Sequence, residues 1–130
     1  MNIGDAAEAT GLSAKMIRHY EAIELLRPQR RGNNYRDFCA RDVAELRFIR
    51  HARELAFPLE EVRQLLALWR DHERPSAEVR RIALEHVTQL EEKADAMAAM
   101  AAALRHLAAH CQDNGRPECP ILDHLAGARA

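Results

Sequence analysis

A stripe of apolar residues in the C-terminal half constrains the fold more than any other feature of the sequence. Its members recur in alternating steps of three and four, which is the heptad spacing of a coiled-coil helix. The pattern predicts one long helix from about Ser76 to Ala109, with Ser76 as its N-cap just after Pro75. One helix cannot bury its own stripe, so we expect a homodimer that forms an antiparallel coiled coil. The stripe consists of Val87, Leu90, Ala94, Met97, Ala101, Leu104 and Ala108.

Size and composition favour a small, mainly α-helical protein. The chain has 130 residues, nearly half of them apolar, but only 5% are aromatic while Ala and Leu are abundant. It contains neither an apolar run of the length that a bilayer requires nor a charged-then-apolar signal at its start. We therefore expect a cytoplasmic protein with no membrane partner.

The beginning of the chain has the pattern of a helix-turn-helix. Met1 to Leu12 is expected to form a short helix that Gly11 stops, and Ser13 is expected to cap a second helix from about Ala14 to Ala22. Two short helices joined by a tight, glycine-containing turn form this motif, and the second helix is the right size for a DNA major groove. In that helix we expect Met16 and Ile17 to face inward and Lys15, Arg18 and Tyr20 to cover the other faces.

A turn-rich, basic segment follows the two helices. Pro28, Gly32 and the pair Asn33-Asn34 predict a turn between two short extended pieces, Leu25-Leu26 and Tyr35-Arg36. Such a hairpin beside a recognition helix is typical of a DNA-binding wing. The residues clustered around its tip are Arg30, Arg31, Tyr35 and Arg36.

Charge is distributed unevenly along the chain. From Ser13 to Arg53 there are ten Lys or Arg and five acidic residues, a net of +5, whereas Asp71 to the end carries −3. A basic head favours a polyanion such as nucleic acid. Considered alone, the asymmetry is explained equally well by a solvated mixed-charge surface.

Two amphipathic segments are expected to complete the core of the head. They run from Asp42 to Leu55 and from Leu59 to Trp69, with Phe57-Pro58 between them and Trp69 facing inward. The resulting division places a DNA-binding domain at 1–70, a dimerisation helix at 71–109, and a metal-binding loop with a C-terminal tail at 110–130.

Two cysteines in one short loop, Cys111 and Cys119, can meet at a single ion. A soft thiolate pair selects a soft cation, and Cu(I) accepts two ligands in line, as Ag(I) and Au(I) should also do. A redox-switched disulfide and two idle thiols remain alternatives. Zinc requires four ligands, of which His110 can be a third but no fourth is evident, and an iron–sulfur cluster requires four cysteines.

The remaining metal-binding residue types give weaker signals. Cys39 is interpreted as a buried packing residue. We find no paired spacing that predicts a metal site among His51, His72, His106 and His124. The chain also lacks paired carboxylates, a glycine-rich phosphate cradle and a nucleophile–base spacing, so we do not expect an enzyme.

Taken together, these motifs resemble the MerR family of transcriptional regulators, and within it the copper-efflux branch. The matching segments are Asn2-Ile3-Gly4-Asp5, Gly11-Leu12-Ser13, Met16-Ile17-Arg18-His19-Tyr20-Glu21, Asn34-Tyr35-Arg36, Leu59-Glu60-Glu61-Val62 and the tail Cys111-x7-Cys119-Pro120-Ile121.

The resemblance implies a mechanism in which a dimer binds a palindromic operator and, with metal bound, distorts the DNA so that RNA polymerase can engage the promoter. The implied inducer is Cu(I), and the alternative is a family regulator that senses a divalent metal such as zinc, or thiol oxidation. The wing is one residue shorter than in some copper regulators, so Arg30 and Arg31 stay alternatives for one position. The expected DNA-contacting residues are Lys15, Arg18, His19, Tyr20, Arg30, Arg31, Tyr35 and Arg36.

Four positions bear on selectivity and turn geometry. In divalent-sensing branches of the family a third cysteine begins the dimer helix, and Ser76 stands at that position here, which favours a monovalent ion. The sequence departs from the family pattern at Glu24, Asn34 and Ala56, where glycine is usual, so we expect altered turns within the same fold.

Overall fold

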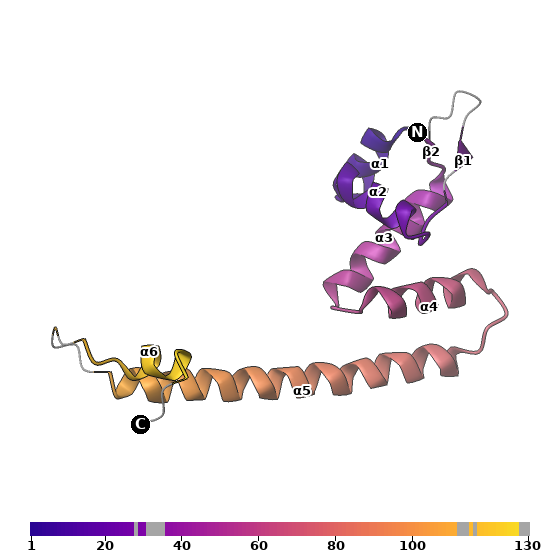
Figure 1. The fold of residues 1–130 in the computed structure, drawn as a ribbon. Coiled ribbons are helices and arrows are strands. Elements are labelled where there is room, and N and C mark those ends of the chain that lie inside the picture. Colours follow the sequence, from indigo (N-terminus) through magenta and orange to yellow (C-terminus); the bar gives the residue numbers. More distant parts are fainter. Residues whose placement is uncertain (28, 31–35, 112–114, 116, 128–130) are drawn as a thin grey trace. The chain divides into compact units, whose positions relative to one another are not determined.

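The structure is a computed structural model, and it describes residues 1–27, 29–30, 36–111, 115 and 117–127. Along the chain the order is α1–α2–β1–β2–α3–α4–α5–α6 (Figure 1). The prediction of a mainly α-helical protein is confirmed. The chain divides into two units, Met1–Ile82 and Ala83–Ala130, each of which is described by itself.

Helix α1 (Ile3–Thr10) is fixed at both ends by local interactions. At its start, the Asn2 side chain accepts a hydrogen bond from the Asp5 backbone N–H at 2.9 Å, while the Asp5 carboxylate accepts one from the Asn2 N–H. At its end, Gly11 adopts a φ of 75°. This left-handed conformation favours glycine, and a Cβ at Gly11 would also displace the guanidinium at the end of the flexible Arg50 side chain.

Helix α2 (Ala14–Ala22) has the bounds that the sequence predicts. The Ser13 hydroxyl accepts a hydrogen bond from the Met16 N–H at 3.1 Å, which confirms Ser13 as the N-cap. Ile17 and Tyr20, three residues apart, form the inward face. The expectation that Met16 faces inward is wrong, because this residue lies off that face and is 38% exposed.

The hairpin consists of β1 (Gln29–Arg30) and β2 (Arg36–Asp37), which pair antiparallel with Arg30 opposite Arg36. The predicted extended piece at Leu25-Leu26 is wrong. These two residues form no strand, and both are buried in the hydrophobic core cluster of the head. The predicted turn residues Asn33 and Asn34 lie outside the described residues.

Helices α3 (Ala40–Glu54) and α4 (Leu59–Arg70) complete the head, as predicted. Two expectations about their residues are corrected. Trp69 stacks on Phe48 with ring centroids 4.8 Å apart and stays 38% exposed, so it covers the core rather than entering it. Cys39 is the exposed residue that precedes α3, not a buried packing residue. The largest fully buried side chains include Phe38, Ile17, Leu25, Leu26, Leu46, Ile49 and Leu66.

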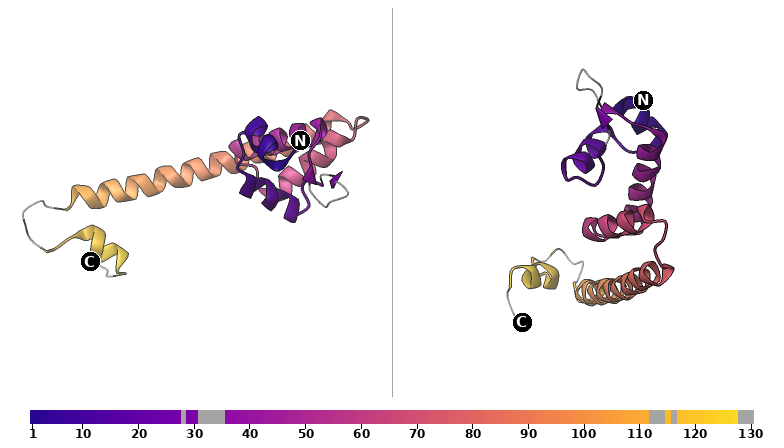
Figure 2. Two further views of the ribbon diagram at one scale, coloured as in Figure 1. Left: turned by 90° about the horizontal axis from the view of Figure 1, so that it is seen from above. Right: turned by 90° about the vertical axis from the view of Figure 1, so that its right-hand side faces the viewer.

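The C-terminal half is dominated by α5 (Ser76–Ala109), whose bounds match the prediction. Figure 2 shows it as one unbroken helix. A short helix, α6 (Pro120–Leu125), follows Cys119. Within the described residues, no helix is both long enough and apolar enough to cross a membrane.

Two turns of the head contain a left-handed residue that is not glycine. Glu24, just after α2, has a φ of 62°, and Ala56, between α3 and α4, has a φ of 64°. Both are positions at which the sequence departs from the expected glycine. The third such position, Asn34, lies outside the described residues. A side chain in this backbone region clashes with the following carbonyl, so both turns carry strain.

Relief of that strain is measurable at Ala56, which is exposed. Ala56→Gly is expected to raise the free energy of unfolding by about 1 kcal/mol in urea titrations at fixed protein concentration. The matched control is Ala67→Gly, at an exposed position inside α4, which should lower stability by about 1 kcal/mol because glycine disfavours a helix. If both substitutions destabilised the protein equally, the strained turn at Ala56 would be refuted.

Candidate nucleic-acid interface and metal-binding loop

The outward face of α2 carries three residues that the sequence predicts to contact DNA. Lys15, Arg18 and His19 are exposed and lie on one side of the helix, because residues three and four apart are neighbours on a helix surface. We call these three the recognition face. Lys and Arg side chains in this arrangement can hold phosphates and reach the edges of bases.

Tyr20 is placed differently from the other predicted DNA contacts. It is 3% exposed and belongs to the core cluster of the head. Its ring tilts against that of His19, with centroids 5.9 Å apart. Tyr20 therefore anchors α2 in the core of the head. A DNA contact by Tyr20 stays a prediction, and only the small exposed part of its side chain is available for it.

Arginines of α3 hold the turn between α1 and α2 in place. Arg47 donates to the Ala9 carbonyl through Nε at 3.3 Å and a terminal nitrogen at 3.0 Å, and Arg50 donates to the Thr10 carbonyl at 2.8 Å. These carbonyls belong to the last turn of α1 and have no partner within the helix. Arg47 and Arg50 are among the ten Lys and Arg residues from Ser13 to Arg53, and although both are exposed they make hydrogen bonds within the head.

An arginine of α4 holds the end of α2 in the same way. Arg63 donates to the Ile23 carbonyl at 2.8 Å and to the Glu24 carbonyl at 3.3 Å. Arg47 and Arg50 bind carbonyls that precede α2, and Arg63 binds carbonyls that follow it. The three arginines therefore hold both ends of the helix that carries the recognition face. We refer to these three residues as the arginine caps.

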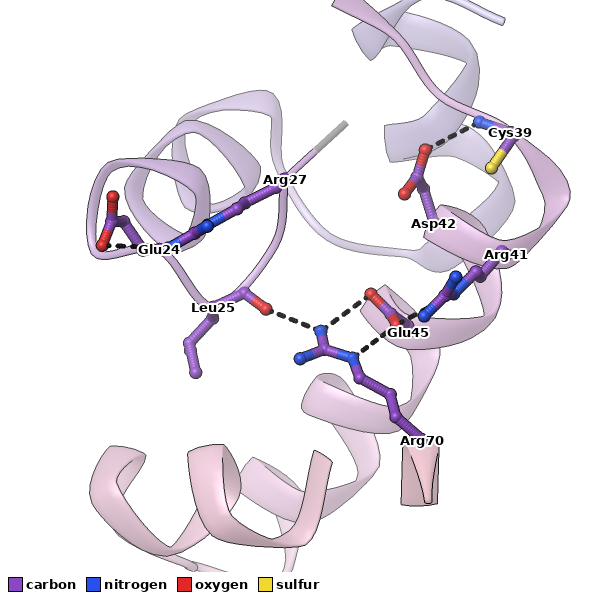
Figure 3. Close-up of a pocket in the computed structure, with 8 residues that line it drawn as sticks. All are labelled: Glu24, Leu25, Arg27, Cys39, Arg41, Asp42, Glu45 and Arg70. Carbon is purple, nitrogen blue, oxygen red and sulfur yellow. Dashed lines mark hydrogen bonds and ion pairs between the residues drawn. The ribbon is translucent and has the colours of Figure 1, made fainter. Parts of the chain in front are cut away.

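A pocket of about 580 Å³ lies between the segment after α2 and helices α3 and α4 (Figure 3). In it the buried carboxylate of Glu45 accepts two hydrogen bonds from Arg70, at 2.8 and 3.0 Å, and lies 3.5 Å from Arg41. Arg70 also donates to the Leu25 carbonyl at 3.1 Å. The hydrogen bond to Glu45 raises the pKa of Arg70. Arg70 joins α4 to α3 through Glu45 and to the segment after α2 through the Leu25 carbonyl.

The structure describes only part of the predicted wing. Arg30 lies in β1 and Arg36 in β2, opposite each other in the hairpin. Arg31 and Tyr35 lie outside the described residues. At the base of the hairpin Phe38 is buried, and its N–H donates to the Met1 carbonyl at 2.8 Å, which ties β2 to the start of α1.

The two cysteines of the C-terminal loop lie close together. Cys111 follows α5, Cys119 precedes α6, and their sulfur atoms are 3.6 Å apart. The pKa of the Cys119 thiol is lowered, first by the backbone N–H of Leu122 and then by the Cys111 thiol. Both hydrogen bonds stabilise the Cys119 thiolate, which is the form of cysteine that binds a metal.

Ser76, the predicted selectivity position, is the first residue of α5 and is exposed. Among the described residues no group of three or more His, Cys, Asp or Glu side chains could hold a metal ion.

A histidine pair at the end of α5 was missed by the sequence analysis. His106 and His110 have ring centroids 4.3 Å apart, with the rings tilted by 48°. The signal was present in the sequence, because residues four apart meet on a helix surface and the long helix was predicted to extend this far.

The apolar stripe of α5 is open to solvent in the single chain. Val87, Leu90, Met97 and Leu104 are all more than a third exposed, and Ala94, Ala101 and Ala108 are exposed as well. A continuous row of exposed apolar side chains marks a surface for association.

Comparison with known proteins decides the family. The model of the MerR HTH family regulatory proteins matches residues 1–69, and the model described as MerR, DNA binding matches residues 43–107. The chain belongs to the MerR family. Families of this kind consist of DNA-binding transcription regulators, so the chain is a regulator rather than an enzyme.

Curated MerR-family relatives and a solved structure match nearly the whole chain. The transcriptional regulator HmrR of Sinorhizobium medicae is 50% identical, over 97% of this chain and 86% of its own. The regulator CueR of Yersinia pestis is 40% identical, over 98% of this chain and 92% of its own. The crystal structure of PbrR691 from Ralstonia metallidurans in complex with lead(II) is 31% identical with a TM-score of 0.84, covering 96% of this chain and 98% of its own.

The lowered pKa of Cys119 predicts a measurable reactivity. In the reduced, chelator-treated protein, the iodoacetamide reaction of Cys119 should reach half its maximal rate at a lower pH than in the urea-unfolded chain, because the thiolate forms earlier. Peptide mass spectrometry resolves the site. Cys111→Ser should move the midpoint only part of the way back, since the Leu122 N–H remains. Identical midpoints in the folded and unfolded chains would contradict the assigned cause.

Proposed function

We propose that this MerR-family regulator senses Cu(I) through Cys111 and Cys119 and activates copper-efflux or detoxification promoters. The observation that carries the proposal is the 3.6 Å separation of the two sulfur atoms, with a lowered pKa at one of them. Two soft thiolates favour a soft monovalent ion, so Ag(I) and Au(I) are expected to substitute for Cu(I). The similarity to CueR and to heavy metal-dependent regulators over nearly the whole chain supports the same class of signal.

The thiol pair fits a two-coordinate ion after a small adjustment. With metal–sulfur bonds of about 2.3 Å, two sulfurs on opposite sides of an ion lie about 4.6 Å apart. The sulfurs, at 3.6 Å, would therefore separate by roughly 1 Å as the ion enters. Cys111 and Cys119 are held at the ends of different helices, α5 and α6, so metal binding is coupled to the position of α6.

Ser76 supports a monovalent signal over a divalent one. A hydroxyl is a poor ligand for soft ions, and a third thiolate in its place would favour three- or four-coordinate divalent metals. The alternative, a family regulator of zinc or another divalent metal or of thiol oxidation, is favoured by the resemblance to the lead(II) complex of PbrR691.

On DNA, the proposed protein acts as a homodimer in the cytoplasm. Residues 1–70 bind a palindromic operator through the recognition face and the wing, residues 71–109 pair the protomers in an antiparallel coiled coil, and residues 110–130 carry the metal loop. The arginine caps keep the recognition face rigid, so movement of one head relative to the other distorts the DNA and lets RNA polymerase engage.

Anaerobic titration with Cu(I), in competition with a strong chelator, tests the metal assignment. The reduced protein should bind one Cu(I) per protomer, and Cys111→Ser or Cys119→Ser should each abolish tight binding and copper-induced transcription while leaving operator binding intact. Cys39→Ser is the matched control, because Cys39 is an exposed thiol outside the loop, and it should bind and respond like the parent protein.

A parallel titration with Zn(II) separates the alternatives. Zinc should bind far more weakly than Cu(I), and Ser76→Cys should strengthen zinc binding by supplying a third thiolate. If zinc bound more tightly than Cu(I), or if both loop-cysteine variants still responded fully to copper, the Cu(I) assignment would be rejected while the family assignment would stand.

If the apolar stripe of α5 is the dimer interface, a charged substitution on α5 should affect dimerisation only when it lies in the stripe. Ala101→Lys places an ammonium group in the stripe and should shift the protein towards monomer, because burial of an unpaired charge is costly. Ala99→Lys introduces the same change at an exposed position on the opposite face and should remain dimeric. Sedimentation velocity measures the difference. A dimer that tolerated both variants equally would show that the stripe is not the interface.

A further inference from the structure

The end of α5 carries an imidazole pair that the proposed copper site does not use. His106 and His110 lie four residues apart, one turn above the other, and both are exposed. Their ring centroids are 4.3 Å apart and the rings are tilted by 48°, so the two imidazoles are direct neighbours on the helix surface. Two histidines at this spacing on one helix face are an arrangement that holds zinc in metalloproteases.

One of the two rings is oriented by the backbone. The Nδ1 atom of His110 lies 2.8 Å from the carbonyl oxygen of His106. Because a carbonyl oxygen only accepts, Nδ1 carries the proton in this hydrogen bond, and in the neutral ring the lone pair is left on Nε2. A backbone carbonyl that fixes the tautomer in this way is typical of histidines that bind metals.

We propose that His106 and His110 form a second metal site, which binds a nitrogen-preferring divalent ion through the two imidazoles, with water in the other positions. Imidazole suits Cu(II), Ni(II) and Zn(II), and affinity is expected to be highest for Cu(II). His106 lies in the last turn of α5 and His110 directly follows the helix, where the partial negative charge of the helix end favours a cation.

The imidazole pair and the thiol pair differ in the ions that they select. Cys111 and Cys119 supply soft sulfur, whereas His106 and His110 supply borderline nitrogen. His110 and Cys111 are consecutive in the chain, so the two donor sets lie next to each other at the end of one helix. The histidine site does not depend on the Cu(I) proposal, and it gives this end of the protein a response to divalent ions as well.

The test uses the full-length chain, without a histidine tag, carrying Cys39→Ser, Cys111→Ser and Cys119→Ser. The thiols are removed because they bind divalent ions and reduce Cu(II). Calorimetric titration with Ni(II) should give one ion per protomer, and Cu(II) should bind more tightly, with nitrogen hyperfine splitting in its electron paramagnetic resonance spectrum. In this background His106→Gln and His110→Gln should each weaken binding at least about tenfold.

The matched control is His51→Gln, which removes an exposed histidine from α3 and should leave the affinity unchanged. Far-UV circular dichroism establishes that each variant keeps its helical content. Absence of Ni(II) and Cu(II) binding would overturn the proposal, as would a loss confined to one of the two histidine variants or a loss of equal size in His51→Gln. Because this background lacks the thiols, such a failure leaves the Cu(I) assignment untouched, and a failure of the Cu(I) titration leaves this site untouched.

Discussion

Charge-assisted hydrogen bonds from arginines to helix-end carbonyls join the helices of the head to one another. A helix leaves its last carbonyls without partners, and both α1 and α2 end close to the turns that define the helix-turn-helix. Arg47, Arg50 and Arg63 satisfy these carbonyls from α3 and α4. Since a guanidinium offers several N–H donors in a fixed plane, it determines the direction of its hydrogen bonds as well as their strength. The orientation of α2, and with it the recognition face, therefore depends on the helices behind it.

This arrangement changes how the basic character of the head is understood. The net charge of the segment favours nucleic acid, but two of its arginines, Arg47 and Arg50, are exposed side chains that make hydrogen bonds within the protein. Arg70, outside that segment, is bound by buried Glu45. What faces outward on α2 is a smaller set that includes Lys15 and Arg18. Long-range attraction to DNA comes from the net charge of +5 on the segment from Ser13 to Arg53, whereas contact with DNA comes from the few side chains that can reach it.

The C-terminal unit carries two pairs of possible metal ligands that differ in the donor atom, which is sulfur in the thiol pair and nitrogen in the imidazole pair. The thiol pair spans the junction between α5 and α6, so an ion bound there acts on the position of α6. In the imidazole pair, His106 lies in the last turn of α5 and His110 directly follows the helix, so an ion bound there would stiffen the end of a helix that is already formed. Both proposed sites lie at the end of the helix that carries the exposed apolar stripe, and a rigid helix is the element through which events at this end could reach the proposed dimer interface.

The sequence by itself determined the helices, since their signals are local. Caps such as Ser13, the glycine at 11 and the spacing of apolar residues act over a few positions, and α2 and α5 begin and end where those signals predict. It also predicted the two loop cysteines that the structure brings together. Only the tertiary structure decided which side chains are buried, because burial depends on what the rest of the chain places against a residue. For that reason Tyr20 packs inside, Trp69 stays half outside, and the arginine caps join residues some forty positions apart.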